Sequence, residues 1–305
     1  MRVGLLAASL GSVVATALLL MTSNAEAYCR SRTCDRAGLC RANGAGCVTE
    51  GLLLYRTSSC VSFSVQQDGS PPNGIDAEHF EELVAEAFAR WTQVDCGEGE
   101  GPSIEIESFG AIECDAVEYN SDQGNANVIV FRNDEWPEDI DPNAFALTTV
   151  SYETRTGEIY DADMEINATV GELTTTAPED GIDLPSILTH EAGHFLGLAH
   201  SLEPGAVMRP SYRPREESLR EIGSDDRAGI CDVYPPGREA KTNSCEPRHG
   251  FASSCATYGG SLAAAGGCSL SRGTPPRSSA AIALAALSLL LGASTARRRP
   301  RRATT

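Results

Sequence analysis

The stretch from His190 to His200 constrains the fold and the chemistry of this chain more strongly than any other part of the sequence. It reads His-Glu-Ala-Gly-His-Phe-Leu-Gly-Leu-Ala-His. On a helix, His190 and His194 lie one turn apart on the same face, so both imidazoles can reach one metal ion. We expect Gly197 to end that helix in a conformation that a residue with a Cβ would resist, which turns the chain back and brings in His200. Three histidines leave the fourth tetrahedral position open, as in a catalytic zinc site.

Glu191 is the predicted general base. It follows His190 directly and therefore points beside the metal, where it can take a proton from a water molecule on the metal. Three of the five histidines of the chain fall in this one stretch. The sequence thus predicts one catalytic Zn²⁺. A structural zinc site would need a fourth protein ligand, for which His249 or a free cysteine remains as the alternative.

A second motif follows the last histidine. Ser201 comes next, and eight residues after His200 stands the run Met208-Arg209-Pro210-Ser211-Tyr212. Together with the histidine motif, this resembles the metzincin metallopeptidases, and within them the matrixins, over about residues 61–234. The resemblance implies that Met208 forms the Met-turn beneath the zinc. It also implies that Pro210 and Tyr212 border the substrate pocket for the side chain after the cleaved bond. A plain core methionine is the alternative for Met208.

The resemblance also implies the function. We expect a secreted or surface-displayed zinc endopeptidase that acts on protein or peptide substrates as a monomer. The substrate would lie antiparallel to an edge strand within residues 125–131, with the helix from Asp183 below it. The rival hypothesis is a binding protein that uses the same scaffold without cutting its partner. The presence of Glu191 argues against that rival.

The hydrophobic pattern predicts the order of helices and strands. Residues 61–65 alternate as in a strand, and apolar residues after Asp76 recur at three- and four-residue steps, as in a helix. Helices are expected from Asp76 to Trp91, from Asp183 to Gly197 and from Ser224 to Val233, and further strands at 104–106, 128–131, 146–151 and 158–167. This order predicts an α/β (α+β) metzincin-like catalytic domain. It would have a twisted mixed sheet, two long helices, a zinc cleft and a short C-terminal subdomain with the Met-turn and the final helix.

Both ends differ in composition from the middle. A charged start, an apolar run and an Ala-Glu-Ala end predict a signal peptide, with an N-terminal membrane anchor as the alternative. Residues 279–296 are apolar and uncharged and precede an arginine cluster, so they predict a short membrane-spanning tail, which would be the chain's one contact with a membrane. This end resembles myxobacterial C-terminal sorting tails, which implies processing near Cys268; a plain single-span anchor is the alternative. The expected division is 1–27 signal peptide, 28–50 cysteine-rich cap, 51–236 peptidase domain, 237–278 linker and 279–305 tail.

The net charge and the cysteine content further limit the kind of protein that this chain can be. The formal net charge is −18, and seven of the 24 Lys and Arg residues lie beyond Cys268, so the body of the chain is more acidic still. Phosphate backbones would repel such a surface, which excludes nucleic-acid binding. Ten of the 11 cysteines remain when Cys268 is assigned to the tail. An even number in an exported chain predicts up to five disulfides of unspecified pairing.

Two features remain open at this level. Asp161, Asp163 and Glu165 alternate along one predicted strand and share a face, so they are candidates for Ca²⁺ binding, with an acidic solvated surface as the alternative. The cysteine-switch propeptide motif of matrixins is absent. A cysteine between Cys29 and Cys47 that occupies the zinc before maturation is one hypothesis; disulfide pairing of these cysteines is favoured.

Overall fold

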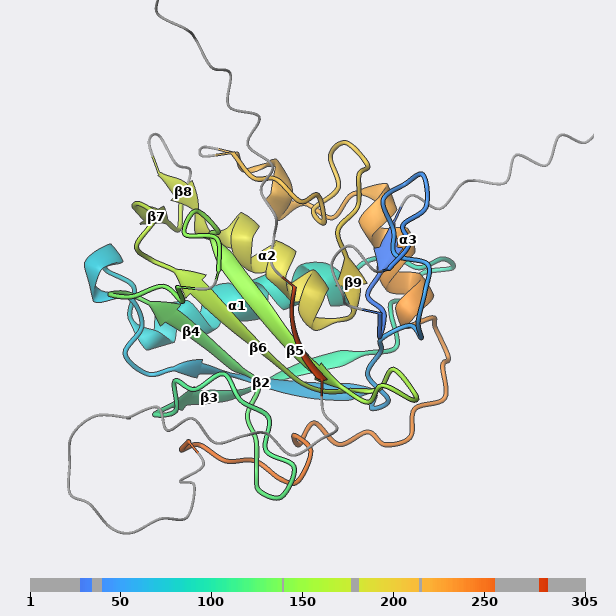
Figure 1. Ribbon diagram of the computed structural model, residues 1–305, viewed down its shortest axis with the longest axis horizontal. Helices are drawn as coiled ribbons and strands as arrows, with labels where there is room; N and C mark the ends of the chain where they lie inside the picture. Colours follow the sequence, from blue (N-terminus) through green and yellow to red (C-terminus); the bar gives the residue numbers. More distant parts are fainter. Residues whose placement is uncertain are drawn as a thin grey trace, which may run out of the picture.

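The computed structural model of the chain describes residues 28–34, 40–138, 140–176, 181–213, 216–255 and 280–284. The predicted signal peptide and most of the predicted tail lie outside these ranges. A twisted sheet forms one layer, and two helices cross one of its faces (Figure 1). This is the predicted α/β (α+β) architecture of a metzincin-like domain.

The main sheet is mixed, as predicted. Its strand order is β10-β5-β6-β4-β2-β3. The strands are β2 (Cys60–Gln66), β3 (Glu105–Ile112), β4 (Val128–Arg132), β5 (Ala146–Tyr152), β6 (Ile159–Asn167) and β10 (Ala280–Leu284). β3, β2, β4 and β6 pair in parallel, whereas β5 runs antiparallel to β6. Short two-residue strands lie outside this sheet: β1 (Cys29–Arg30) with β9 (Leu198–Ala199), and β7 (Leu173–Thr174) with β8 (Ile182–Asp183).

The helices cover the sheet with apolar side chains. α1 (Ala77–Thr92) begins where Asp76 accepts a hydrogen bond from the His79 N–H at 2.9 Å. Its buried stripe is the predicted one: Phe80, Leu83, Val84, Ala87, Phe88 and Trp91. α2 (Leu184–Phe195) lies beside α1, and the Trp91 indole N–H donates to the Thr189 carbonyl at 2.7 Å. α3 (Ser224–Val233) is the predicted last helix, and two single-turn 3-10 helices, η1 (Pro71–Asn73) and η2 (Ser218–Arg220), lie in connecting segments.

The predicted substrate-binding edge strand is wrong. Residues 125–131 contribute β4, which lies between β6 and β2 inside the sheet and has no free edge. Among the strands that precede residue 280, the outermost on the side of α2 is β5, which we call the border strand. It lies there because the connection from β4 passes over to that side before the chain returns as β6. The backbone of β10 pairs antiparallel with the outer edge of β5. Among the described residues, no helix combines the length and the apolar run needed to cross a membrane.

Five disulfides form among the residues that the structure describes, in agreement with the prediction of up to five. They join Cys29 to Cys47, Cys34 to Cys40, Cys60 to Cys245, Cys96 to Cys231 and Cys114 to Cys255. The cysteines between 29 and 47 are thus paired with one another, so none of these four offers a thiolate to a metal.

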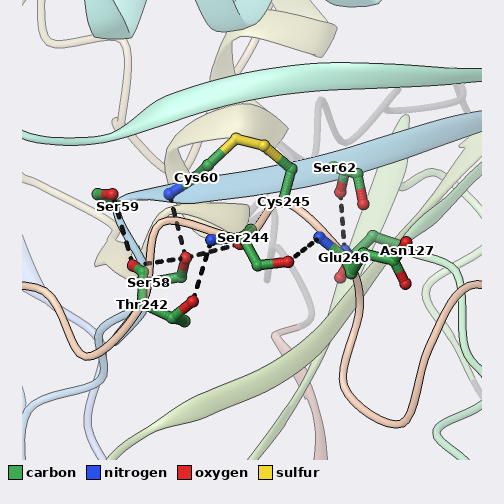
Figure 2. The surroundings of a disulfide bond; sticks show 9 residues. All are labelled: Ser58, Ser59, Cys60, Ser62, Asn127, Thr242, Ser244, Cys245 and Glu246. Carbon is green, nitrogen blue, oxygen red and sulfur yellow. Dashed lines mark hydrogen bonds between the residues drawn. A yellow bond between two sulfur atoms is a disulfide. The ribbon is translucent and has the colours of Figure 1, made fainter.

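The segment after α3 is tied to the sheet. Figure 2 shows the Cys60–Cys245 bond, which joins β2 to this segment, with the Ser58 hydroxyl donating to the Ser244 carbonyl at 2.8 Å. The Cys60–Cys245 and Cys114–Cys255 disulfides join residues that are 185 and 141 positions apart in the sequence. Such long loops remove much conformational freedom from the unfolded chain.

Candidate metal centre and active site

The three histidines of the motif converge on one point. His190 and His194 project from α2, and His200 follows β9. The Nε2 atom of His200 lies 3.2 Å from the Nε2 atoms of both His190 and His194. Gly197 makes the turn between them with a φ of +98°, in the region that favours glycine. A Cβ at this position would also stand 2.9 Å from the Leu54 carbonyl oxygen.

The other ring nitrogens have carbonyl partners. Nδ1 of His190 donates to the Val207 carbonyl at 2.7 Å, and Nδ1 of His194 donates to the Leu198 carbonyl at 3.0 Å. A carbonyl oxygen only accepts, so both rings carry their proton on Nδ1. That leaves their Nε2 lone pairs for a metal ion, an arrangement typical of zinc-binding histidines.

These residues fit a zinc ion. Ligand nitrogens about 2.0–2.1 Å from a tetrahedral Zn²⁺ lie about 3.3 Å apart, close to the two separations found here. Burial lowers the pKa of His190 to about 4 and that of His200 to about 3, and it lowers the pKa of His194 well below its usual value. The three rings are therefore neutral near pH 7, which metal binding requires. In the described part of the chain, no fourth His, Cys, Asp or Glu joins this group.

The alternative fourth ligand, His249, lies elsewhere. It lies in the segment that follows α3, where its Nε2 atom is 3.2 Å from the hydroxyl oxygen of Tyr119. A structural zinc site with His249 is therefore not what the fold assembles.

Glu191 points into the same site from α2. Its carboxylate is buried and accepts a 2.6 Å hydrogen bond from the hydroxyl of Thr148 on β5. Burial raises the pKa of Glu191 to about 7, while the hydrogen bond from Thr148 acts in the opposite direction. In the metal-free site Glu191 is thus about half ionised at neutral pH, and a bound cation would favour the carboxylate, which is the form that accepts a proton. The role of Thr148 had no signal in the sequence, because a threonine in a strand is ordinary.

Met208 lies beneath α2. It is buried, and its side chain lies against Gly193 of α2, where a Cβ would collide with its sulfur and would stand 2.8 Å from the Trp91 ring. The turn around Met208 is held from α3. The Asp226 carboxylate accepts hydrogen bonds from the N–H groups of Val207 at 2.7 Å and Met208 at 3.1 Å. Asp226 thereby fixes the same Val207 peptide that orients His190.

A cavity opens beside His190 and Glu191. Pro210 and Tyr212 line it, together with Phe145, Ala146, Ser186, Ile187, Arg209, Ser211 and Leu219. The Tyr212 hydroxyl accepts a 2.6 Å hydrogen bond from the Asp183 N–H at the start of α2, and its ring packs edge-on against Phe145. The cavity therefore has mostly apolar walls that are anchored to α2.

The three calcium candidates are buried in the sheet rather than solvated. Asp161, Asp163 and Glu165 share one face of β6, on which each is at most 6% exposed. Glu165 accepts from the Arg132 guanidinium at 2.7 Å, and Asp163 accepts from the Val128 N–H at 2.7 Å. Burial raises the pKa of Asp161 to about 7 and raises that of Asp163 well above its usual value. The alternative of a solvated acidic face is wrong, and calcium binding stays a prediction.

Comparison with known proteins places this site in a family. The Matrixin family profile matches residues 56–235, which is more than half of the chain and includes the whole site. The chain therefore belongs to the matrixin family.

Several curated proteins share parts of this sequence. A protein named metalloendoproteinase 1 from Glycine max is 30% identical over 174 residues, which cover 54% of this chain and 48% of that protein. Metalloendoproteinase 1-MMP from Arabidopsis thaliana is 44% identical over 66 residues, or 22% of this chain and 18% of its own length. Human neutrophil collagenase is 44% identical over 63 residues, or 21% of this chain and 14% of its own length. The chain thus spans less than half the length of each of these relatives.

Proposed function

We propose that this protein is a zinc-dependent endopeptidase that hydrolyses peptide bonds in proteins or peptides. The observation that carries the proposal is the convergence of three histidine Nε2 atoms next to a buried Glu191 carboxylate. Three neutral nitrogen ligands with no fourth protein ligand in the described chain are typical of a catalytic zinc rather than a structural one. The relatives named metalloendoproteinases and collagenase agree with this activity.

The chain's own residues account for the proton transfers. A bound Zn²⁺ would supply Lewis acidity, lowering the pKa of water to about 7 and polarising the scissile carbonyl. Glu191 accepts the proton of the attacking water and then delivers it to the leaving amine. Thr148 holds the Glu191 carboxylate in place at 2.6 Å during both transfers. His190 and His194 keep their orientation through the carbonyls of Val207 and Leu198.

The substrate would bind along the edge of β5. An extended peptide can add to an exposed sheet edge through main-chain hydrogen bonds. The backbone of residues 280–284 pairs there as β10, with residue 284 opposite Thr148. An extended segment on this edge therefore passes beside Glu191, and a substrate strand would take the place of β10. We expect the side chain after the cleaved bond to enter the cavity lined by Pro210 and Tyr212.

The cellular setting is part of the proposal. Five disulfides agree with an oxidising compartment, and hence with a secreted protein or one displayed on the cell surface. The signal peptide over residues 1–27 and the tail over residues 279–305 would direct this export.

A peptide-library assay tests the activity. Residues 28–267, folded under oxidising conditions, are incubated with the library before and after zinc removal by a chelator, and again after zinc is restored. We expect cleavage that stops on chelation and returns with zinc. Cleavage that persists without zinc, or no cleavage by protein that holds one zinc per chain, would contradict the proposal. The cut sites give the side-chain preference of the cavity in the same experiment.

A further inference from the structure

We propose that Ser31, in the disulfide-bonded N-terminal segment, is a positioning residue for the zinc site. The Ser31 hydroxyl donates a 2.8 Å hydrogen bond to the Leu198 carbonyl oxygen. The same oxygen accepts the Nδ1 proton of His194 at 3.0 Å. One carbonyl oxygen thus uses its two lone pairs for the zinc ligand and for Ser31. The inference rests on the zinc site of the proposed function.

Every polar group of Ser31 forms a hydrogen bond, which fixes the position of the residue. Its side chain is buried, with the residue 4% exposed. Its N–H donates to the Gly197 carbonyl at 2.9 Å, and its own carbonyl accepts from the Leu54 N–H at 2.8 Å. Ser31 therefore holds two successive peptide groups of the turn that leads from His194 to His200.

The surrounding strand pair strengthens this contact. β1 runs antiparallel to β9, with Cys29 opposite Ala199 and Arg30 opposite Leu198. The disulfide from Cys29 to Cys47 ties β1 to the rest of the N-terminal segment. Arg30 also forms an ion pair with Asp232 of α3 at 3.0 Å. The segment 28–34 is thus joined both to the turn between His194 and His200 and to α3.

The expected consequence concerns zinc retention. Without the Ser31 hydroxyl, the Leu198 carbonyl oxygen keeps the His194 ring as its one side-chain partner, and the peptide is held only by its place in the β1–β9 strand pair. The carbonyl that orients the ring is then less firmly placed, and the ring is held less precisely toward the metal. Loss of a group that bonds directly to a metal ligand typically lowers metal affinity by about 10- to 100-fold. Ser31 acts through the Leu198 carbonyl, so we expect an effect at the lower end, about 10-fold. The N-terminal segment would accordingly remain part of the working enzyme and would not be a removable inhibitor.

Four variants of the exported chain test this role. Ser31→Ala removes the hydroxyl, and Ser31→Thr retains it. Ser31→Val has the shape of threonine without the donor. Ser58→Ala is the control, because the Ser58 hydroxyl also donates to a carbonyl at 2.8 Å, that of Ser244 beside the Cys60–Cys245 disulfide (Figure 2). The readouts are the rate of zinc release to a chromogenic chelator and the visible spectrum of the Co²⁺-substituted protein.

We expect Ser31→Ala and Ser31→Val to release zinc about 10-fold faster, with a changed Co²⁺ spectrum. Ser31→Thr and Ser58→Ala should match the wild-type protein. Equal release rates for the threonine and valine variants would overturn the proposal, and this pair decides the question even if the alanine variant does not fold. Wild-type protein that holds no zinc would contradict the proposed function itself. Wild-type protein with one zinc per chain, together with an unchanged Ser31→Val rate, would contradict only the role of Ser31.

Discussion

The hydroxyl of Thr148 donates a 2.6 Å hydrogen bond to the carboxylate of Glu191. This bond links the border strand β5, where we place the substrate, to α2, which carries two of the zinc ligands. The same side chain therefore lies between the proposed substrate edge and the proposed base. Its removal should change the proton transfer without changing the metal ligands.

Thr148→Val is expected to lower kcat/KM about 10-fold at pH 7, since a hydrogen bond to a charged group contributes about 1.5 kcal/mol or more. The hydrogen bond lowers the pKa of Glu191, so its loss raises that pKa. The acidic limb of the pH–rate profile should then move to higher pH. Thr148→Ser, which keeps the hydroxyl, is the control. A Thr148→Val profile that coincides with the wild-type profile would show that the bond has no part in the reaction.

Gly193→Ala should destabilise the protein by about 1–3 kcal/mol through overpacking. The added methyl group would collide with the Met208 sulfur and stand 2.8 Å from the Trp91 ring. Because Trp91 and Met208 are both buried, neither can move aside without disturbing the core. Thermal unfolding of the zinc-loaded protein measures the loss. Gly205→Ala is a useful comparison, since a Cβ there meets no neighbour and only the positive φ of +88° opposes it. An unchanged melting temperature for Gly193→Ala would refute the predicted close packing.

The zinc-free protein should lose stability as the pH falls from about 6.5 toward 4. His190 and His200 have folded-state pKa values lowered to about 4 and about 3, whereas the unfolded chain binds protons near pH 6.5. The unfolded state therefore holds more protons in this window, and acidification favours it. Each histidine accounts for at most about 2 kcal/mol between pH 6.5 and pH 5. Thermal unfolding of chelated protein at pH 7 and pH 5 measures this, and His200→Gln should lose less stability than the wild type. An equal loss in both would argue against a buried neutral His200.

Asp161 should make the protein less stable as the pH rises, opposite to the effect of the histidines, and Asp161→Asn should remove this loss. Burial raises the folded-state pKa of Asp161 to about 7, so its contribution to stability is present at low pH and is lost as the pH rises through 7. Asparagine avoids the cost of ionising a buried carboxyl group. The melting temperature of Asp161→Asn relative to wild type should thus be higher at pH 8 than at pH 5. Glu138→Gln, on an exposed connecting segment, serves as the surface control. A constant difference across pH would mean that Asp161 ionises normally in the fold.

Much of the fold was predictable because its signals are local. The helix start at Asp76, the apolar stripe to Trp91 and the positive φ of Gly197 follow from capping, periodicity and the needs of a turn. The histidine motif likewise has a fixed helical spacing, so the grouping of His190 and His194 needed no tertiary information.

The contacts that complete the site were not predictable from the sequence, since they join distant parts of the chain. Thr148 and Glu191 are 43 residues apart, and Ser31 and Leu198 are 167 apart. The border position of β5 depends on strand order, which alternation alone does not encode. The resemblance to matrixins placed the substrate edge at 125–131 because it carried no information on how these particular strands are ordered.

The most direct test of the whole account measures zinc content and kcat/KM on the same preparations of wild type and Glu191→Ala. Glu191 is not a metal ligand, so both proteins should hold one zinc per chain. Removal of the base should lower kcat/KM by at least about 100-fold. Glu191→Ala protein that retains zinc and hydrolyses peptides within about 10-fold of the wild type would contradict the role assigned to Glu191, and with it the proposed mechanism.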